Sequence, residues 1–115
     1  MIGSTSGVVS EPETAHYCAA KAATHSLVKT LCVDLSKHGI ITNAVAPGWV
    51  HTGMVDEFVS NADPADLAKV NPIGRVGQPD EIANVIEYLA LDAPEYLNGA
   101  IIMMDGGQTA AAPVI

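Results

Sequence analysis

A tyrosine and a lysine stand four residues apart near the start of this sequence, at Tyr17 and Lys21. Residues at positions i and i+4 lie one above the other on one face of a helix, so we expect the lysine ammonium beside the phenol. Free tyrosine is a poor acid or base at neutral pH. A neighbouring ammonium favours the phenolate and moves its ionisation toward neutral pH, where a general acid–base catalyst works best. The pair therefore predicts a tyrosine that exchanges a proton with a substrate.

A serine at position 4 precedes this pair, in a loop of small residues that leads into the helix. Its hydroxyl could donate a hydrogen bond to a substrate oxygen and stabilise the charge that develops there as a hydride arrives. Three such groups on one oxygen are typical of a site that reduces a carbonyl. Taken singly, a Tyr-x-x-x-Lys pair often occurs by chance, and a serine in such a loop is usually a turn residue. Whether these three residues are catalytic therefore depends on the rest of the sequence.

The elements that must position these residues follow from the pattern of apolar and turn residues. Residues 1–10 predict the end of a strand running into a loop, and Ala15 to His38 predict a long helix that stops at Gly39. Its apolar stripe is Leu27, Val28, Leu31 and Leu35. Ile40 to Ala46 then reads as a short buried strand, ended by Pro47 and Gly48. Strand, helix and strand in this order predict a parallel unit.

The second half of the chain repeats the alternation. Two weak helical pieces, around 54–60 and 64–70, predict a lid over the site, and a further helix begins at Pro79. Residues 100–104 are a continuous apolar run, which is typical of a strand buried on both faces. The fold class is therefore α/β with a parallel sheet, and 115 residues make at most one domain.

Composition excludes several classes of protein. Hydrophobic residues make up 49% of the chain and charged residues 16%, which excludes intrinsic disorder. The net charge is −8 and the five cations are scattered, so neither nucleic acid nor an anionic membrane is an expected partner. We find neither an apolar run long enough to span a bilayer nor a secretory signal in the first residues, and we expect a cytoplasmic protein.

The cysteines and histidines predict no metal site. Cys18 and Cys32 fall in one predicted helix, roughly 21 Å apart, and are expected as free thiols in a reducing compartment. The histidines show no metal-ligand spacing with carboxylates, and each is expected at the surface or as a capping residue. They are His16, His25, His38 and His51.

Four blocks of sequence resemble, in order, motifs of the short-chain dehydrogenase/reductase family, and together they cover nearly the whole chain. The blocks are Ser4–Gly7 with Tyr17–Ala23, Asn43–Thr52, Asn71–Ala83 and Asn98–Gly107. This resemblance implies the C-terminal part of a doubly wound, Rossmann-type nucleotide-binding fold. It also implies an oxidoreductase that interconverts an alcohol and a carbonyl with NAD or NADP, acting on a small-molecule substrate as a homodimer or homotetramer.

The resemblance also implies a role for each site residue. Tyr17 would be the catalytic acid/base, Ser4 would position the substrate oxygen, and Lys21 would assist the tyrosine and hold the nicotinamide ribose. Tyr17 and Lys21 would thus also contact the cofactor, whose nicotinamide and pyrophosphate region would be lined by Pro47, Gly48, Val50 and Thr52. Trp49 is expected mainly as a packing residue, and Arg75 and Asp105 as structural residues.

The family's glycine-rich phosphate loop, its NAD/NADP-discriminating residue and its fourth catalytic residue, an asparagine, have no counterpart in these 115 residues. Asn43 is no substitute for that asparagine, because it falls on the following strand. We therefore expect 1–115 to be a single partial domain, the C-terminal half of such an enzyme. The alternative is a truncated, non-catalytic remnant that acts at most as an oligomerisation or interaction module.

Overall fold

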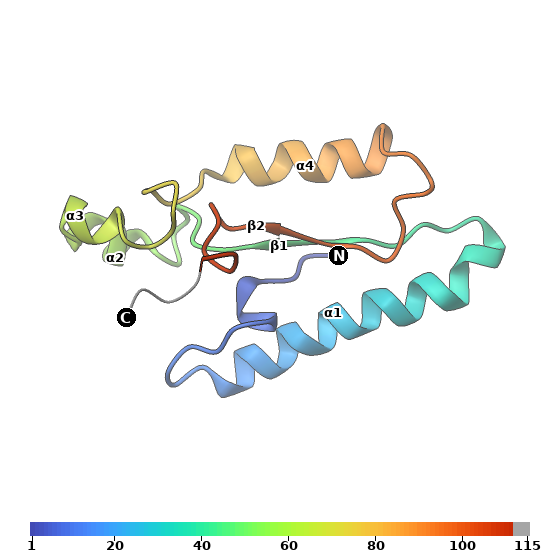
Figure 1. Ribbon diagram of the computed structural model, residues 1–115, viewed down its shortest axis with the longest axis horizontal. Helices are drawn as coiled ribbons and strands as arrows, with labels where there is room; N and C mark the ends of the chain where they lie inside the picture. The colour runs from blue at the N-terminus through green and yellow to red at the C-terminus, as the bar shows by residue number, and fades with distance from the viewer. Residues whose placement is uncertain (112–115) are drawn as a thin grey trace.

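Two short parallel strands lie between two long helices in the computed structural model, which describes residues 1–111 (Figure 1). β1 (Ala44–Pro47) pairs in parallel with β2 (Ile101–Met104). The segment 1–3 runs along the other side of β1, where Gly3 N donates to the carbonyl of Val45 over 2.7 Å. The α/β class with a parallel sheet is confirmed, and so is the strand-like start of the chain.

The long helix α1 (Ala15–Leu35) passes into a 3-10 turn, η2 (Ser36–His38), and stops at Gly39. Gly39 has a φ of 73°, a left-handed conformation in which glycine carries no Cβ penalty, so the predicted stop is confirmed. The predicted stripe is wrong at Leu27, whose side chain is 45% exposed. The helix contacts the rest of the described chain mainly through the short 3-10 helix η1 (Thr5–Gly7), so only a narrow line of its surface is covered.

The lid region contains two short helices, α2 (Asp56–Asn61) and α3 (Pro64–Leu67), close to the predicted positions. α4 (Pro79–Leu91) begins at Pro79, as predicted, and covers the face of the sheet opposite α1 (Figure 1). Glu81 closes its first turn by accepting from Gln78 N over 2.7 Å. Both terminal nitrogens of Arg75 donate to the Glu81 carboxylate over 2.7 and 2.8 Å, and these bonds lower the pKa of Glu81 to about 2.

The predicted strand over 40–46 begins too early, because the structure forms β1 only from Ala44. Side-chain amides hold the preceding residues instead: Asn98 Oδ1 accepts from Thr42 N, and Asn43 Oδ1 accepts from Ala100 N, each over 2.9 Å. β2 was predicted to be buried on both faces, and that prediction is wrong, since all four of its residues are partly exposed.

A carboxylate, Asp105, holds the turn that follows β2. It is 8% exposed, and its oxygens accept from Gly107 N over 2.9 Å, from Thr109 N over 2.8 Å and from Thr109 Oγ1 over 2.6 Å. Burial alone would raise the pKa of Asp105, but the hydrogen bonds from Thr109 and Gly107 outweigh burial and lower it below its usual value. The structural role expected of Asp105 agrees with these contacts.

Within residues 1–111, no helix is both long and apolar enough to cross a membrane. The same part of the chain contains no group of three or more His, Cys, Asp or Glu side chains placed to hold a metal ion. Cys18 and Cys32 are both free thiols.

Replacing Asp105 with alanine is expected to lower the free energy of unfolding of the complete protein by about 2–3 kcal/mol, because three donors lose a charged acceptor. Since the pKa of the folded carboxyl is lowered, this stabilisation is present above its ordinary value of 3.8 and is lost as pH falls through the lower folded value. Urea denaturation at pH 7 and at pH 3 measures both effects. Asp34→Ala, on the exposed side of α1, is the control; an equal loss in the two variants would contradict the prediction.

Candidate active site

An open cavity of about 810 Å³ lies where the carboxyl end of β1 meets the beginnings of α1 and α4. Figure 1 shows these ends and the lid helices α2 and α3 gathered at one end of the molecule. The structure brings all seven predicted site residues to the lining of this cavity: Ser4, Tyr17, Lys21, Pro47, Gly48, Val50 and Thr52. These residues come from three separate parts of the sequence, and the fold brings their side chains and backbone groups to one cavity.

Tyr17 and Lys21 lie on the cavity side of the first turns of α1. The Lys21 ammonium is 5.6 Å from the centre of the Tyr17 ring, and the tyrosine is 38% exposed. Lys21 Nζ also donates to the carbonyl of Ile2 over 3.2 Å. An ammonium has three protons, so this bond fixes the lysine and leaves two for other acceptors in the cavity.

Ser4 caps the N-terminus of η1 and is only 8% exposed. Its Oγ accepts from Ser6 N over 3.1 Å. A hydroxyl has one proton and two lone pairs, so this bond orients the serine while leaving its proton free to be donated. The Ser4 hydroxyl can therefore donate a hydrogen bond to a carbonyl or alkoxide oxygen in the cavity.

The backbone of Ser4 is tied to α1 through His25, whose Nε2 accepts from Ser4 N over 3.3 Å. His25 is 6% exposed, so the expectation of a surface or capping histidine is wrong here. Burial, followed by the nearby positive charges of Lys29 and Lys21, lowers the pKa of His25. A signal for this contact was present in the sequence: positions 17, 21 and 25 lie one helical turn apart on the same face.

The loop after β1 approaches β2 closely at Gly48, whose N–H donates to the carbonyl of Met104 over 3.0 Å. A Cβ on Gly48 would lie 2.8 Å from Asp105 Cβ and 3.0 Å from its Cα, so only glycine fits without a shift. Further along this loop, His51 N donates to the Gly77 carbonyl over 2.9 Å and Gly77 N donates to the Trp49 carbonyl over 2.8 Å. Backbone groups alternate in direction along a strand, so those of Val50 face away from Gly77 and toward the open side of the loop.

Apolar side chains form the lid side of the cavity. The Trp49 and Phe58 rings are 4.9 Å apart between centroids and inclined by 39°, and Met54 and Val55 lie in the same lining. Trp49 thus packs, as expected, while also facing the cavity. The cavity is also lined by Phe58, Glu11 and His16, which no motif or spacing in the sequence marks as site residues.

A second cavity, of about 330 Å³, lies beside Arg75, Glu81 and Asp105. The charged groups there are already engaged: Arg75 with Glu81, and Asp105 with Thr109 and Gly107. Its charged residues are therefore engaged in holding the fold together, and all seven predicted site residues line the larger cavity instead.

Comparison with protein families matches residues 1–109 to the family described as enoyl-(acyl carrier protein) reductase. The cyclohexanol dehydrogenase of Rhodococcus sp. (strain TK6) is 44% identical over 95 residues, which are 83% of this chain and 35% of that protein. A 3-oxoacyl-[acyl-carrier-protein] reductase of Thermotoga maritima is 37% identical over 106 residues, 92% of this chain and 43% of that protein.

Solved structures show the same relationship. A gluconate 5-dehydrogenase from Burkholderia cenocepacia J2315, in complex with NADP and tartrate, superposes with a TM-score of 0.88 at 37% identity, covering 96% of this chain and 44% of that one. A 4-hydroxyisoleucine dehydrogenase complexed with NADH gives a TM-score of 0.91 at 33% identity, covering 96% and 46%. The chain thus spans less than half the length of each of these four relatives.

Placing alanine at Gly48 is expected to destabilise the complete protein by about 1–3 kcal/mol, because the new methyl group meets the side chain and backbone of Asp105. Gly53→Ala is the matched control, since a Cβ there has nothing within 4 Å. Thermal unfolding of the two variants measures the difference. Equal melting temperatures would show that the loop does not need its close approach to β2.

Proposed function

The chain belongs to the short-chain dehydrogenase/reductase family, and from that premise we propose that the complete protein is an NAD(P)-dependent oxidoreductase that interconverts an alcohol and a carbonyl, with Tyr17 as general acid/base. The observation that carries this proposal is the common cavity of Ser4, Tyr17 and Lys21. A phenol, a hydroxyl with a free proton and an ammonium around one open space form a set of donors suited to an oxygen that gains negative charge.

In the direction of reduction, the substrate carbonyl oxygen accepts hydrogen bonds from the Ser4 hydroxyl and the Tyr17 phenol. As hydride reaches the carbonyl carbon, the C=O bond becomes a single bond and negative charge builds on the oxygen. The phenol proton moves to that oxygen, which gives the alcohol and leaves a phenolate on Tyr17. In oxidation the phenolate takes the proton back from the alcohol, so one residue serves both directions.

Lys21 supports this proton transfer from the next turn of α1. Its ammonium lies 5.6 Å from the centre of the Tyr17 ring and stabilises a negative phenolate more than a neutral phenol. The bond to the Ile2 carbonyl keeps the ammonium in place while two protons remain available. Those protons fit the ribose hydroxyls of a nicotinamide cofactor, the second role proposed for Lys21.

The loop after β1 fits one end of such a cofactor. Gly48 carries no side chain where the loop turns over the carboxyl end of the sheet, and the Val50 backbone groups face away from Gly77. This is the edge at which parallel sheets bind nucleotides. We propose that Pro47, Gly48, Val50 and Thr52 hold the nicotinamide end of NAD or NADP, which supplies or accepts the hydride when bound. The names of the relatives, one with NADP and one with NADH, support both cofactors equally.

We also propose that 1–115 is one partial domain of this enzyme, which is supported by its match to less than half of each relative reported above. A homodimer or homotetramer is supported by the alanine-rich first half of α1, whose small side chains permit a close helix–helix interface. A cytoplasmic location is supported by the two free thiols, Cys18 and Cys32, which a reducing compartment keeps unpaired.

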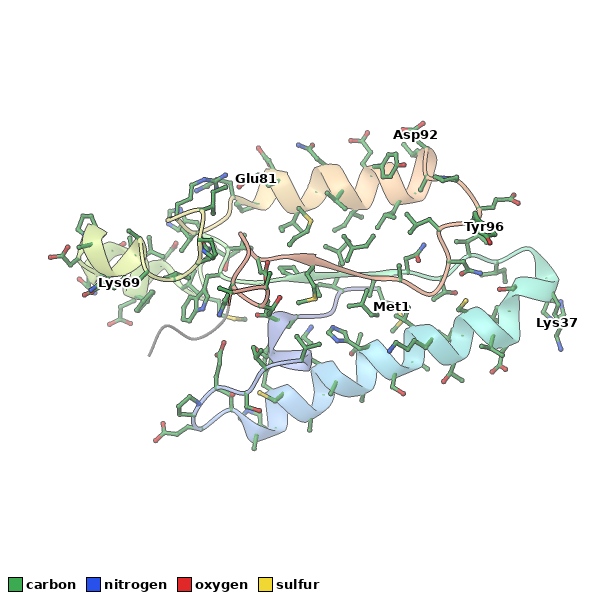
Figure 2. All side chains as sticks on the ribbon, in the orientation of Figure 1. Met1, Lys37, Lys69, Glu81, Asp92 and Tyr96 are labelled. Carbon is green, nitrogen blue, oxygen red and sulfur yellow. The ribbon has the colours of Figure 1, made fainter. Side chains whose placement is uncertain are left out.

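Tyr17→Phe in the complete protein is expected to lower kcat by at least about 10²–10⁴-fold, because the proton donor is lost. Cofactor affinity, followed by the fluorescence of NADH or NADPH, should change little, since the ring and Lys21 remain. The matched control is Tyr96→Phe: Tyr96 is fully exposed and lies beyond the far end of α4 (Figure 2).

Two results would contradict the proposal. Unchanged turnover of Tyr17→Phe would remove the tyrosine from the chemistry. A complete protein that binds neither NADH nor NADPH at any concentration tested would instead favour the non-catalytic remnant.

A further inference from the structure

His25 is a buried, titratable side chain that the proposed mechanism does not use. It lies on α1 two helical turns after Tyr17 and one after Lys21, with 6% of its surface exposed. Its Nε2 accepts from Ser4 N over 3.3 Å. One imidazole thus joins the helix that carries the tyrosine to the backbone of the residue that carries the hydroxyl.

The two glycines on either side of Ser4 mark how closely the ring approaches. A Cβ on Gly7 would lie 2.5 Å from His25 Cε1, and a Cβ on Gly3 would overlap the His25 ring nitrogen Nε2. Neither glycine adopts a left-handed backbone conformation, so neither is required by the path of the chain. What requires them is the space that the imidazole occupies between them.

We propose that His25 is a positioning residue: its neutral imidazole accepts the Ser4 backbone N–H and holds the segment 3–7 on α1, so that the Ser4 hydroxyl and the Tyr17 phenol face the same substrate oxygen. Its effect on turnover rests on the function proposed above, whereas the contact itself does not. Because His25 acts through Ser4, its loss misplaces the hydroxyl and leaves the cofactor loop after β1 untouched.

Only a neutral imidazole can make this contact. A protonated ring carries N–H on both nitrogens, so Nε2 would face the Ser4 N–H as a second donor. The charged groups that act on the ring, Lys21 and Lys29, come from its own helix, and both oppose protonation. The segment 3–7 and β1, which pack next to it, contain no ionisable side chain. Burial and the two lysines together lower the pKa of His25 and keep the ring neutral at physiological pH.

Two substitutions of His25 distinguish the effect of its hydrogen-bond acceptor from the effect of its side-chain volume. In His25→Gln, the carboxamide oxygen takes the place of Nε2, so the acceptor is kept. In His25→Met, the volume is similar but the strong nitrogen acceptor is replaced by a thioether sulfur, which accepts only weakly. We expect His25→Met to lower kcat of the complete enzyme by about 10–100-fold with little change in the KM for cofactor, and His25→Gln to recover most of that loss. His38→Met, in the exposed 3-10 turn η2 that follows α1, is the control.

The pH profile supplies a readout that a purely structural role would not move. In the direction of reduction, where Tyr17 gives up a proton, kcat of the natural enzyme should fall as the pH drops through the lowered pKa of His25. The same limb should be absent from His25→Gln, which cannot be protonated in this range. Equal kcat in all variants, an equal loss in the glutamine and methionine variants, or an acid limb that persists in His25→Gln would each overturn the proposal.

Hydrogen exchange at the Ser4 amide tests the contact with His25 independently of catalytic activity. Hydrogen exchange at Ser4 N, measured by NMR on the complete protein, should be slow in the natural protein and in His25→Gln, and about tenfold faster in His25→Met. If the enzyme proves inactive but this pattern holds, the proposed function fails while the role of His25 in holding Ser4 stands. If exchange at Ser4 is equally fast in all three proteins, the contact is absent and the inference is overturned.

Discussion

The geometry of the candidate active site depends on the contact between the segment 1–7 and α1. Lys21 Nζ donates to the carbonyl of Ile2, and Ser4 N donates to His25 Nε2 one helical turn further on. Two bonds from one helix face therefore hold the end of a strand and the serine that follows it. Because Tyr17 lies on the same face, one turn before Lys21, the same contact determines where the serine hydroxyl lies relative to the phenol. Small residues allow this close approach, and a side chain at Gly3 or Gly7 would collide with the imidazole.

A second constraint acts at the carboxyl ends of β1 and β2. Gly48 passes against Asp105, whose carboxylate is held by Thr109 and Gly107, so the loop that runs from Pro47 to Thr52 begins from a fixed point. The bridge between Val50 and Gly77 then turns the Val50 backbone away from Gly77. One wall of the cavity thus carries the hydroxyls that the proposed reaction directs at a substrate oxygen, and the other carries the loop that we propose holds the cofactor. Their meeting at one edge of a parallel sheet follows from the α/β topology.

Local signals predicted the helices well, since Gly39 and Pro79 act within one turn of the chain. Strand limits and burial depended on distant partners. Asn98, more than fifty residues away, holds Thr42 outside the strand, and the narrow contact of α1 with η1 leaves Leu27 exposed. The seven predicted site residues share one cavity because the motif spacings reflect the fold. The burial of His25 is not predicted, because a histidine without metal-ligand spacing is expected at the surface or as a capping residue, although its i+4 relation to Lys21 places both side chains on one helix face.

The central claim is that the Ser4 and Tyr17 hydroxyls hydrogen-bond to the same substrate oxygen. A ternary crystal structure tests this claim most directly. The complete protein would be crystallised with NAD or NADP and an unreactive carbonyl analogue. We expect the analogue oxygen within about 2.6–3.2 Å of both the Ser4 Oγ and the Tyr17 hydroxyl, with Lys21 still bonded to the Ile2 carbonyl. A carbonyl oxygen bound elsewhere in the cavity, beyond the reach of both hydroxyls, would contradict the claim.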